Sequence, residues 1–250
     1  MSDSAPYRYA IYFAPPRDSG LWRLAQSWLG RDCETGAALP QPALEGWSAE
    51  EIAAVTASPR RYGFHATLKA PFRLAEDRTP AELHQSIAAF AARQQPFSAP
   101  RLKVSALGPF LALTFPAPAP QMEALAAAAV TELEPLRAPL NEGELERRLA
   151  AGLSPRQEEL LRRWGYPYVL QEFRFHMTLT GPLADPQRRE ALQTKLAALF
   201  RPALTEPVPV AEVCLYSQAS PEAPFLLTGR FPLGAAGAAA QGEQEEQTVR

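Results

Sequence analysis

The chain has 250 residues, of which 46% are hydrophobic and 21% charged, and its formal net charge is −2. This length can bury a substantial core, and the composition is that of an ordinary globular protein. No run approaches the roughly 18 to 20 apolar residues that cross a bilayer, and the N-terminus lacks the basic and apolar segments of a secretory signal, so we expect a cytoplasmic protein without membrane contact. The slightly acidic balance also argues against a broad grip on a nucleic-acid backbone.

Apolar periodicity and helix-start signals predict a mixture of strands and helices in the first half of the chain. Ser48 and Glu51 have capping-box spacing, and Thr79-Pro80 is a typical helix start. In chain order we predict a strand at 8–14, a helix at 21–29, a helix beginning at 48, a strand at 63–72, a helix at 79–94, and strands at about 101–107 and 110–115.

The second half begins with a helical region at about 121–164. We expect breaks near Pro139 and at Ser154-Pro155, where Ser154 and Gln157 indicate a fresh capping box. A strand at 169–182, a helix at 186–200 and closing strands at about 208–216 and 225–231 follow. Residues 234–250 contain almost nothing that could pack, so we predict a disordered tail.

The order motif strand, helix, strand, strand occurs twice in the same sense. His65 precedes Val104 by 39 residues, and His176 precedes Val213 by 37. The sequence therefore predicts an α+β fold built from a duplicated lobe. We assign residues 1–233 to one bilobal domain, with pseudo-symmetric lobes around the strands at 63–72 and 169–182 and a helical insertion at about 121–164.

The two motif strands carry matching heptads, His-Ala-Thr-Leu-Lys-Ala-Pro from His65 and His-Met-Thr-Leu-Thr-Gly-Pro from His176. Alternate residues of a strand share a face, so each motif is predicted to be apolar behind and polar in front. The predicted polar faces consist of His65, Thr67 and Lys69 in the first motif, and of Arg174, His176, Thr178 and Thr180 in the second.

Such faces suit phosphoryl chemistry. In-line attack on a phosphodiester needs a base on one side of phosphorus and an acid on the other, and imidazole can serve as either near neutral pH. The predicted roles are an acid/base pair, His65 and His176, and substrate-binding groups, Thr67, Thr178, Lys69, Arg174 and Thr180. The remaining histidine, His84, has no partner motif, and we expect it beside the core.

Paired His-x-Thr-Leu strands in a duplicated α+β chain resemble the two-histidine (2H) phosphoesterase superfamily. The strings Arg-Arg-Tyr-Gly-Phe-His-Ala-Thr-Leu-Lys-Ala-Pro-Phe and Phe-Arg-Phe-His-Met-Thr-Leu-Thr-Gly are similar to its subgroup encoded with phosphonate-degradation genes. The resemblance spans about Tyr7 to Leu233. It implies two antiparallel sheets facing a central cleft with helices outside, no metal or other cofactor, and cyclic or ordinary phosphodiesters as substrates. On that likeness His65 and His176 are the acid/base pair and Thr67 and Thr178 bind phosphate, whereas Lys69 and Arg174 follow from strand geometry alone.

Other catalytic signatures are absent from the sequence. It contains no glycine-rich loop ending in Lys-Ser/Thr, no G-x-S-x-G elbow and no metal-spaced cluster, so P-loop, serine-hydrolase and zinc chemistry are not favoured. Three functions stay open: hydrolysis of a small cyclic phosphodiester, such as a phosphoribosyl cyclic phosphate of phosphonate catabolism; opening of 2′,3′-cyclic phosphates at RNA ends; and binding of a nucleotide or phosphorylated metabolite without turnover. We expect a small phosphorylated substrate, no extended nucleic acid and a monomer.

Overall fold

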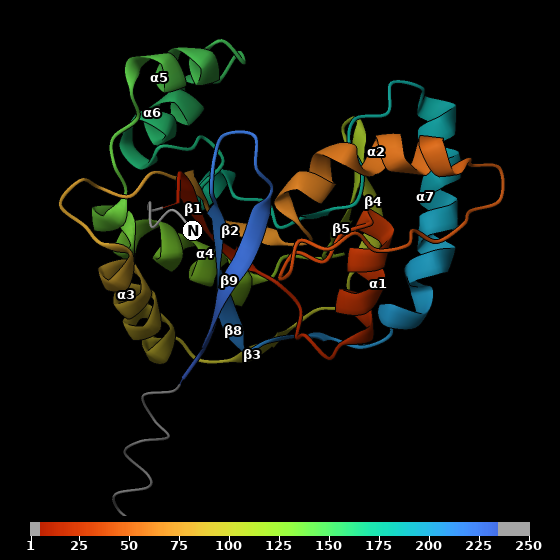
Figure 1. Cartoon of the computed structure of the whole chain (residues 1–250), viewed down its shortest axis with the longest axis horizontal. Coiled ribbons are helices and arrows are strands. Elements are labelled where there is room, and N and C mark those ends of the chain that lie inside the picture. The colour runs from red at the N-terminus through yellow and green to blue at the C-terminus, as the bar shows by residue number, and fades with distance from the viewer. Residues whose placement is uncertain (1–5, 235–250) are drawn as a thin grey trace, which may run out of the picture.

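A seven-stranded antiparallel sheet runs through the part of the chain that the computed structural model describes, residues 6–234 (Figure 1). Its strand order is β4-β5-β6-β2-β1-β8-β9, and a second sheet pairs β3 with β7. The predicted α+β class and its two antiparallel sheets are confirmed. The predicted tail at 234–250 lies, apart from Gly234, outside the described residues. Between residues 6 and 234 we find no helix with the length and apolar character needed to span a membrane.

Most element bounds follow the local sequence signals. Both predicted capping boxes form, Ser48 with Glu51 and Ser154 with Gln157. The helices are α1 (Gly20–Leu29), α2 (Ala49–Tyr62), α3 (Pro80–Arg93), α4 (Pro120–Glu132), α5 (Glu142–Leu149), α6 (Pro155–Trp164) and α7 (Pro186–Phe200), with short 3-10 turns η1 (Glu134–Leu136), η2 (Leu170–Glu172) and η3 (Arg201–Ala203). The strands are β1 (Arg8–Phe13), β2 (Ala66–Phe72), β3 (Phe97–Ala99), β4 (Lys103–Leu107), β5 (Phe110–Thr114), β6 (Met177–Thr178), β7 (Val208–Val210), β8 (Glu212–Gln218) and β9 (Phe225–Pro232).

The chain crosses between the two halves of the large sheet. After β2, helix α3 packs against β9, but the next long strands, β4 and β5, extend the other half beside β6. After β6, helix α7 packs against β4 and β5, whereas β8 and β9 return to the half that holds β1 and β2 (Figure 1). Strand β3 connects α3 to β4, strand β7 connects α7 to β8, and these two connecting strands pair with each other. Each half of the sheet therefore contains elements from both motif series.

The two halves meet where β2 pairs with β6. One residue pair, Ala66 opposite Met177, sets the register there. The predicted strand at 169–182 is wrong in its length, because only Met177–Thr178 forms strand. Residues 170–172 form the η2 turn, with Leu170 at a φ of 55°, and the Leu179 and Thr180 amides both donate to the Leu111 carbonyl instead of continuing a regular ladder.

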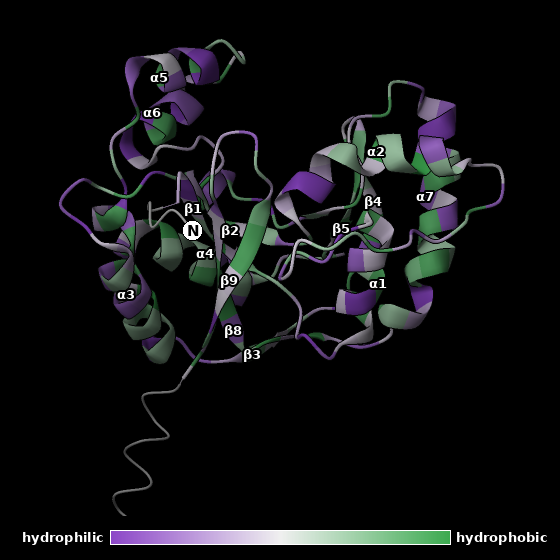
Figure 2. Ribbon diagram, in the orientation of Figure 1, coloured by the Kyte–Doolittle hydropathy of each residue, from purple (hydrophilic) through white to green (hydrophobic). Residues whose placement is uncertain are grey.

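The apolar phase of each motif is buried as its alternation predicts. Phe64, Ala66 and Leu68 of the first motif and Met177 and Leu179 of the second all belong to the main core. Burial varies along the region at 121–164. Helix α4 packs on β2, whereas α5 has no buried residue and is largely hydrophilic on the outside of the molecule (Figure 2).

Candidate active site

Four polar side chains of the motifs share one face where β2 meets β6. In an antiparallel pair, the neighbours of two opposed residues also oppose each other on a common face. Because Ala66 lies opposite Met177, this register sets His65 against Thr178 and Thr67 against His176. All four side chains line one cavity of about 490 Å³. The structure thus brings together the residues predicted for acid/base chemistry and for phosphate binding.

Each of these imidazoles is held by the main-chain carbonyl two residues before it. Nδ1 of His65 donates to the Gly63 oxygen at 2.9 Å, and Nδ1 of His176 donates to the Arg174 oxygen at 2.8 Å. A carbonyl oxygen can only accept, so in each neutral ring Nδ1 carries the proton and Nε2 keeps its lone pair. The two histidines therefore keep the same nitrogen, Nε2, for chemistry, and Nε2 of His65 accepts a hydrogen bond from the Thr67 hydroxyl at 3.2 Å.

Gly63 fixes the first of these carbonyls at the end of α2. Its φ is 80°, and its amide donates to the Pro59 carbonyl to end the helix. A Cβ added here would lie 2.8 Å from the Cβ of Cys33, which is closer than two carbons can pack. A glycine is therefore required both for the turn and for the close approach of Cys33.

Aromatic rings surround His65. The Tyr12 ring is stacked on the imidazole with a centroid distance of 3.6 Å and an interplanar angle of 14°, and Tyr216 is tilted at 6.0 Å. Burial lowers the pKa of His65 from 6.5 to about 4; the Gly63 hydrogen bond opposes this change, and the nearby His176 adds to it. His65 is therefore neutral at pH 7 and able to accept a proton.

Lys69 does not face the cavity, and the prediction that it contacts substrate is wrong. The pairing of β1 with β2 shifts register twice between Tyr9 and Tyr12, which interrupts the alternation after Thr67. Lys69 is 3% exposed. Its ammonium donates to Glu134 Oε2 at 2.7 Å and to the Val130 carbonyl at 3.0 Å. Ala70 takes the place in the cavity wall that regular alternation would give to Lys69.

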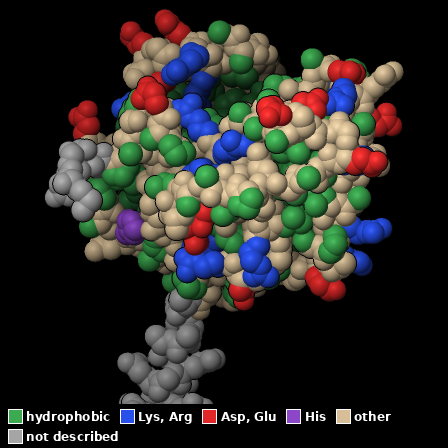
Figure 3. All heavy atoms as spheres, turned by 45° about the vertical axis from the view of Figure 1, so that its right-hand side comes forward, with side chains coloured by type: hydrophobic (Ala, Val, Ile, Leu, Met, Phe, Trp, Pro, Cys, Tyr) green, Lys and Arg blue, Asp and Glu red, His purple; other side chains and the backbone are tan. Residues whose placement is uncertain are grey.

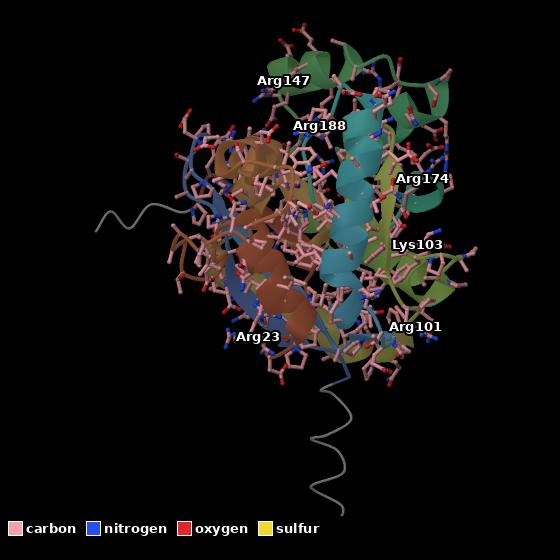
Figure 4. The ribbon with its side chains drawn as sticks, turned by 90° about the vertical axis from the view of Figure 1, so that its right-hand side faces the viewer. Arg23, Arg101, Lys103, Arg147, Arg174 and Arg188 are labelled. Atoms are coloured by element: carbon pink, nitrogen blue, oxygen red, sulfur yellow. The ribbon has the colours of Figure 1, made fainter. Side chains whose placement is uncertain are left out.

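Thr180 also lies away from the cavity, so its predicted contact with substrate is wrong. It lies beyond the end of β6, is fully buried, and its hydroxyl accepts a hydrogen bond from the Leu111 amide at 3.0 Å. The hydroxyl therefore binds the backbone of β5 and does not reach the cavity. Arg174, in contrast, is exposed and lines a neighbouring pocket of about 390 Å³ together with His176 (Figure 4).

The cavity and this pocket form one continuous cleft. They share Thr67, Ala70, Tyr166, Tyr168 and His176. On the pocket side the Phe110 ring lies 5.9 Å from the His176 ring. Across residues 6–234, no group of three or more His, Cys, Asp or Glu side chains is placed to hold a metal ion.

Several lining residues were not predicted from the sequence. Tyr62 was expected in the core or at the rim, and it does line the cavity. No periodicity or motif marks the others, which come from β1, from α5 and from the segment just before the second motif. These missed residues are Arg8, Tyr12, Arg147, Arg148, Tyr166 and Tyr168.

Solved structures that align with this chain include E. coli LigT. Its complex with NADP+ aligns with 92% of this chain and 99% of LigT, at a TM-score of 0.43 and 14% identity. Its apo form aligns over the same shares at a TM-score of 0.42 and 14% identity. A structure described as a phosphoesterase aligns at a TM-score of 0.38 and 14% identity, again over 92% and 99% of the two chains.

Sequence comparisons give closer matches. The family described as "Protein of unknown function (DUF1045)" matches residues 67–226. A protein of Janthinobacterium sp. (strain Marseille) named "Ribose 1,5-bisphosphate phosphokinase PhnN" is 38% identical over 243 residues, which is 95% of this chain and 53% of that protein. A protein of the same name from Laribacter hongkongensis (strain HLHK9) is 41% identical over 201 residues, 80% of this chain and 46% of that protein. The chain spans about half the length of these curated relatives.

Proposed function

This chain belongs to the DUF1045 family, and we propose that it hydrolyses a small, cyclic phosphodiester by two-histidine acid/base catalysis without a metal ion. The observation that carries the proposal is the array of His65, Thr67, His176 and Thr178 on one cavity wall. Residues on a diagonal of two paired strands are about 7 Å apart, so one phosphorus fits between the two imidazoles. The 2H phosphoesterases that the motifs resemble use such a pair.

The environment of His65 suggests which member of the pair is the base, and the acid role is then left for His176. His65, neutral because burial holds its pKa at about 4, accepts a proton at Nε2 from the attacking water. The water oxygen bonds to phosphorus while the bond to the leaving oxygen breaks, and His176, protonated at Nε2, gives its proton to that oxygen. When the substrate binds, the Thr67 hydroxyl turns from Nε2 of His65 to donate to one non-bridging oxygen, and the Thr178 hydroxyl donates to the other. The product is a phosphomonoester with a free hydroxyl, and both imidazoles return to their starting states by proton exchange with water.

For the substrate we propose the cyclic phosphate of a phosphorylated ribose. The curated relatives are named for a kinase that acts on a ribose bisphosphate, which supports a sugar phosphate as the class of ligand. We do not extend the kinase reaction to this chain, because its sequence contains no glycine-rich loop ending in Lys-Ser/Thr to hold a nucleotide.

The test follows hydrolysis by phosphorus NMR with a panel of sugar and nucleoside cyclic phosphates in the presence of a chelator. We expect turnover by the wild type, and a loss of about 10² to 10⁴ in kcat for His65→Ala and for His176→Ala. The matched control is His84→Ala, because His84 is exposed on α3 and packs against Phe231 outside the cleft. Turnover that survives both active-site substitutions would exclude the paired-histidine mechanism, and binding without turnover of any compound would favour a non-catalytic ligand-binding protein.

A further inference from the structure

Three arginines converge on the larger cavity of the cleft. Arg8 lies at the start of β1, and Arg147 and Arg148 lie in the last turn of α5; all three line the cavity. Their charges act on one another. Burial is the main cause that lowers the pKa of Arg148; Tyr166 and Glu144 oppose this change, and the positive charges of Arg8 and Arg147 add to it. Two distant segments of the chain thus place like charges together beside the histidine pair.

None of these three charges is paired with a carboxylate, although Glu144 offsets part of the charge of Arg148 from a longer distance. The described residues that line the cavity include no Asp or Glu, and none of the three arginines forms an ion pair with a carboxylate in residues 6–234. Their partners are neutral. Arg8 donates to Gln218 Oε1 at 2.9 and 2.7 Å, and Arg148 donates to the Gly165 carbonyl at 2.7 Å. These bonds orient the guanidinium groups without cancelling their charge, and the one carboxylate that acts on Arg148, Glu144, is itself paired with Arg73.

This cluster is a local exception in a chain of net charge −2. Lys69 of β2, a few residues from the site, is a buried cation that is paired with a carboxylate, since its ammonium lies 2.7 Å from Glu134. In the space-filling view, Lys and Arg side chains gather along the hollow beneath α5 and α6 (Figure 3). Gathering like charges costs free energy unless an anion binds among them, and guanidinium groups match the oxygens of phosphate.

The histidine and threonine array already serves the phosphodiester that is attacked, which carries one negative charge. The three arginines carry more positive charge than this single negative charge requires. We propose that Arg8, Arg147 and Arg148 form a second phosphate site, which binds a phosphomonoester on the substrate beside the cyclic phosphodiester. This inference rests on the proposed function and deepens it, because it selects substrates that carry a separate, dianionic phosphate.

Turnover gives the first test. The substrates are a ribose cyclic phosphate and the same compound with a 5-phosphate, and the measured quantity is the ratio of their kcat/KM values. We expect the 5-phosphate to raise kcat/KM at least about tenfold in the wild type, and this ratio to fall to near one in Arg147→Glu, because a hydrogen-bonded charge pair contributes about 1.5 to 3 kcal/mol. The control is Arg101→Ala, which removes an exposed arginine at the opposite end of the molecule from Arg147 and should keep the wild-type ratio (Figure 4).

Binding gives a second test that needs no turnover. Calorimetric titration compares ribose 5-phosphate with ribose, using the wild type, Arg147→Glu and a His65→Ala/His176→Ala double variant. We expect only ribose 5-phosphate to bind, with affinity retained in the double histidine variant and lost at least about tenfold in Arg147→Glu. Since α5 has no buried residue, Arg147→Glu should fold, which circular dichroism checks.

The two tests separate the two proposals. Turnover with a wild-type ratio near one, together with binding that Arg147→Glu does not weaken, would overturn the second phosphate site and leave the phosphodiesterase intact. Binding that depends on Arg147, with no hydrolysis of either cyclic compound, would support the site and overturn the phosphodiesterase.

Discussion

Replacing Tyr12 with alanine is expected to raise the pKa of His65 and to shift the acid limb of the pH–rate profile upward. Tyr12 is 1% exposed and its ring stacks on the imidazole at 3.6 Å, so its loss admits water to one face of His65. Burial is the main cause of the fall in pKa from 6.5 to about 4, a gap worth about 3.4 kcal/mol. Opening one face should recover about one pKa unit, or about 1.4 kcal/mol.

The assay is kcat/KM against pH, with a parallel NMR titration of the imidazole. Activity requires the unprotonated form of His65, so kcat/KM decreases when the pH is lower than the pKa of this group. The wild-type limb should therefore lie near pH 4, and at pH 4.5 a shift of one unit should cost about threefold in kcat/KM. The cavity left by alanine should also cost about 3 to 5 kcal/mol of stability, so folding is checked by circular dichroism.

The control is Tyr12→Phe, which keeps the stacked ring and removes only the hydroxyl. Its acid limb should stay near that of the wild type. An acid limb that does not move in Tyr12→Ala, or a wild-type limb near pH 6.5, would refute the conclusion that burial by this ring lowers the pKa of His65.

Three further outcomes are expected. Because the folded pKa of His65 is depressed, its contribution to stability is complete above pH 6.5 and is lost as pH falls through about 4; His65→Gln should remove up to about 3.4 kcal/mol of this pH dependence in urea unfolding. Lys69→Met should lower the free energy of unfolding by up to about 3 kcal/mol by breaking the pair with Glu134, with kcat of the folded protein unchanged; a loss of kcat would restore Lys69 to the site. Gly63→Ala should cost about 1 to 3 kcal/mol in thermal unfolding and also lower kcat, because its Cβ would meet Cys33 and move the carbonyl that orients His65; wild-type stability and kcat would contradict this.

Local signals predicted most of the elements. Capping boxes and a proline in the first turn mark helix starts within a residue, as for α3 and for α7, whose bounds Pro186–Phe200 match the prediction. The common face of His65 with Thr67 also follows from alternation, because it involves two residues on one side of the first register shift.

Features that depend on tertiary contacts could not be predicted. Alternation assumes a regular strand, and the register shifts in β2 turn Lys69 toward Glu134. The second motif looks like a long strand, yet its amides bond irregularly around Leu111, which buries Thr180. Arg8, Arg147 and Arg148 come from the start of β1 and from α5, so no sequence spacing connects them with the histidines.

The crossing of the chain at β3 and β7 bears on the origin of the molecule. Each motif series gives its first strand and helix to one half of the sheet and its last two strands to the other. Two identical half-length chains that exchanged their last strands would form this same arrangement as a swapped homodimer. Joining such chains end to end gives one polypeptide in which neither series can be cut away without opening both halves, so we expect the two series, produced as separate fragments, to fold only when mixed.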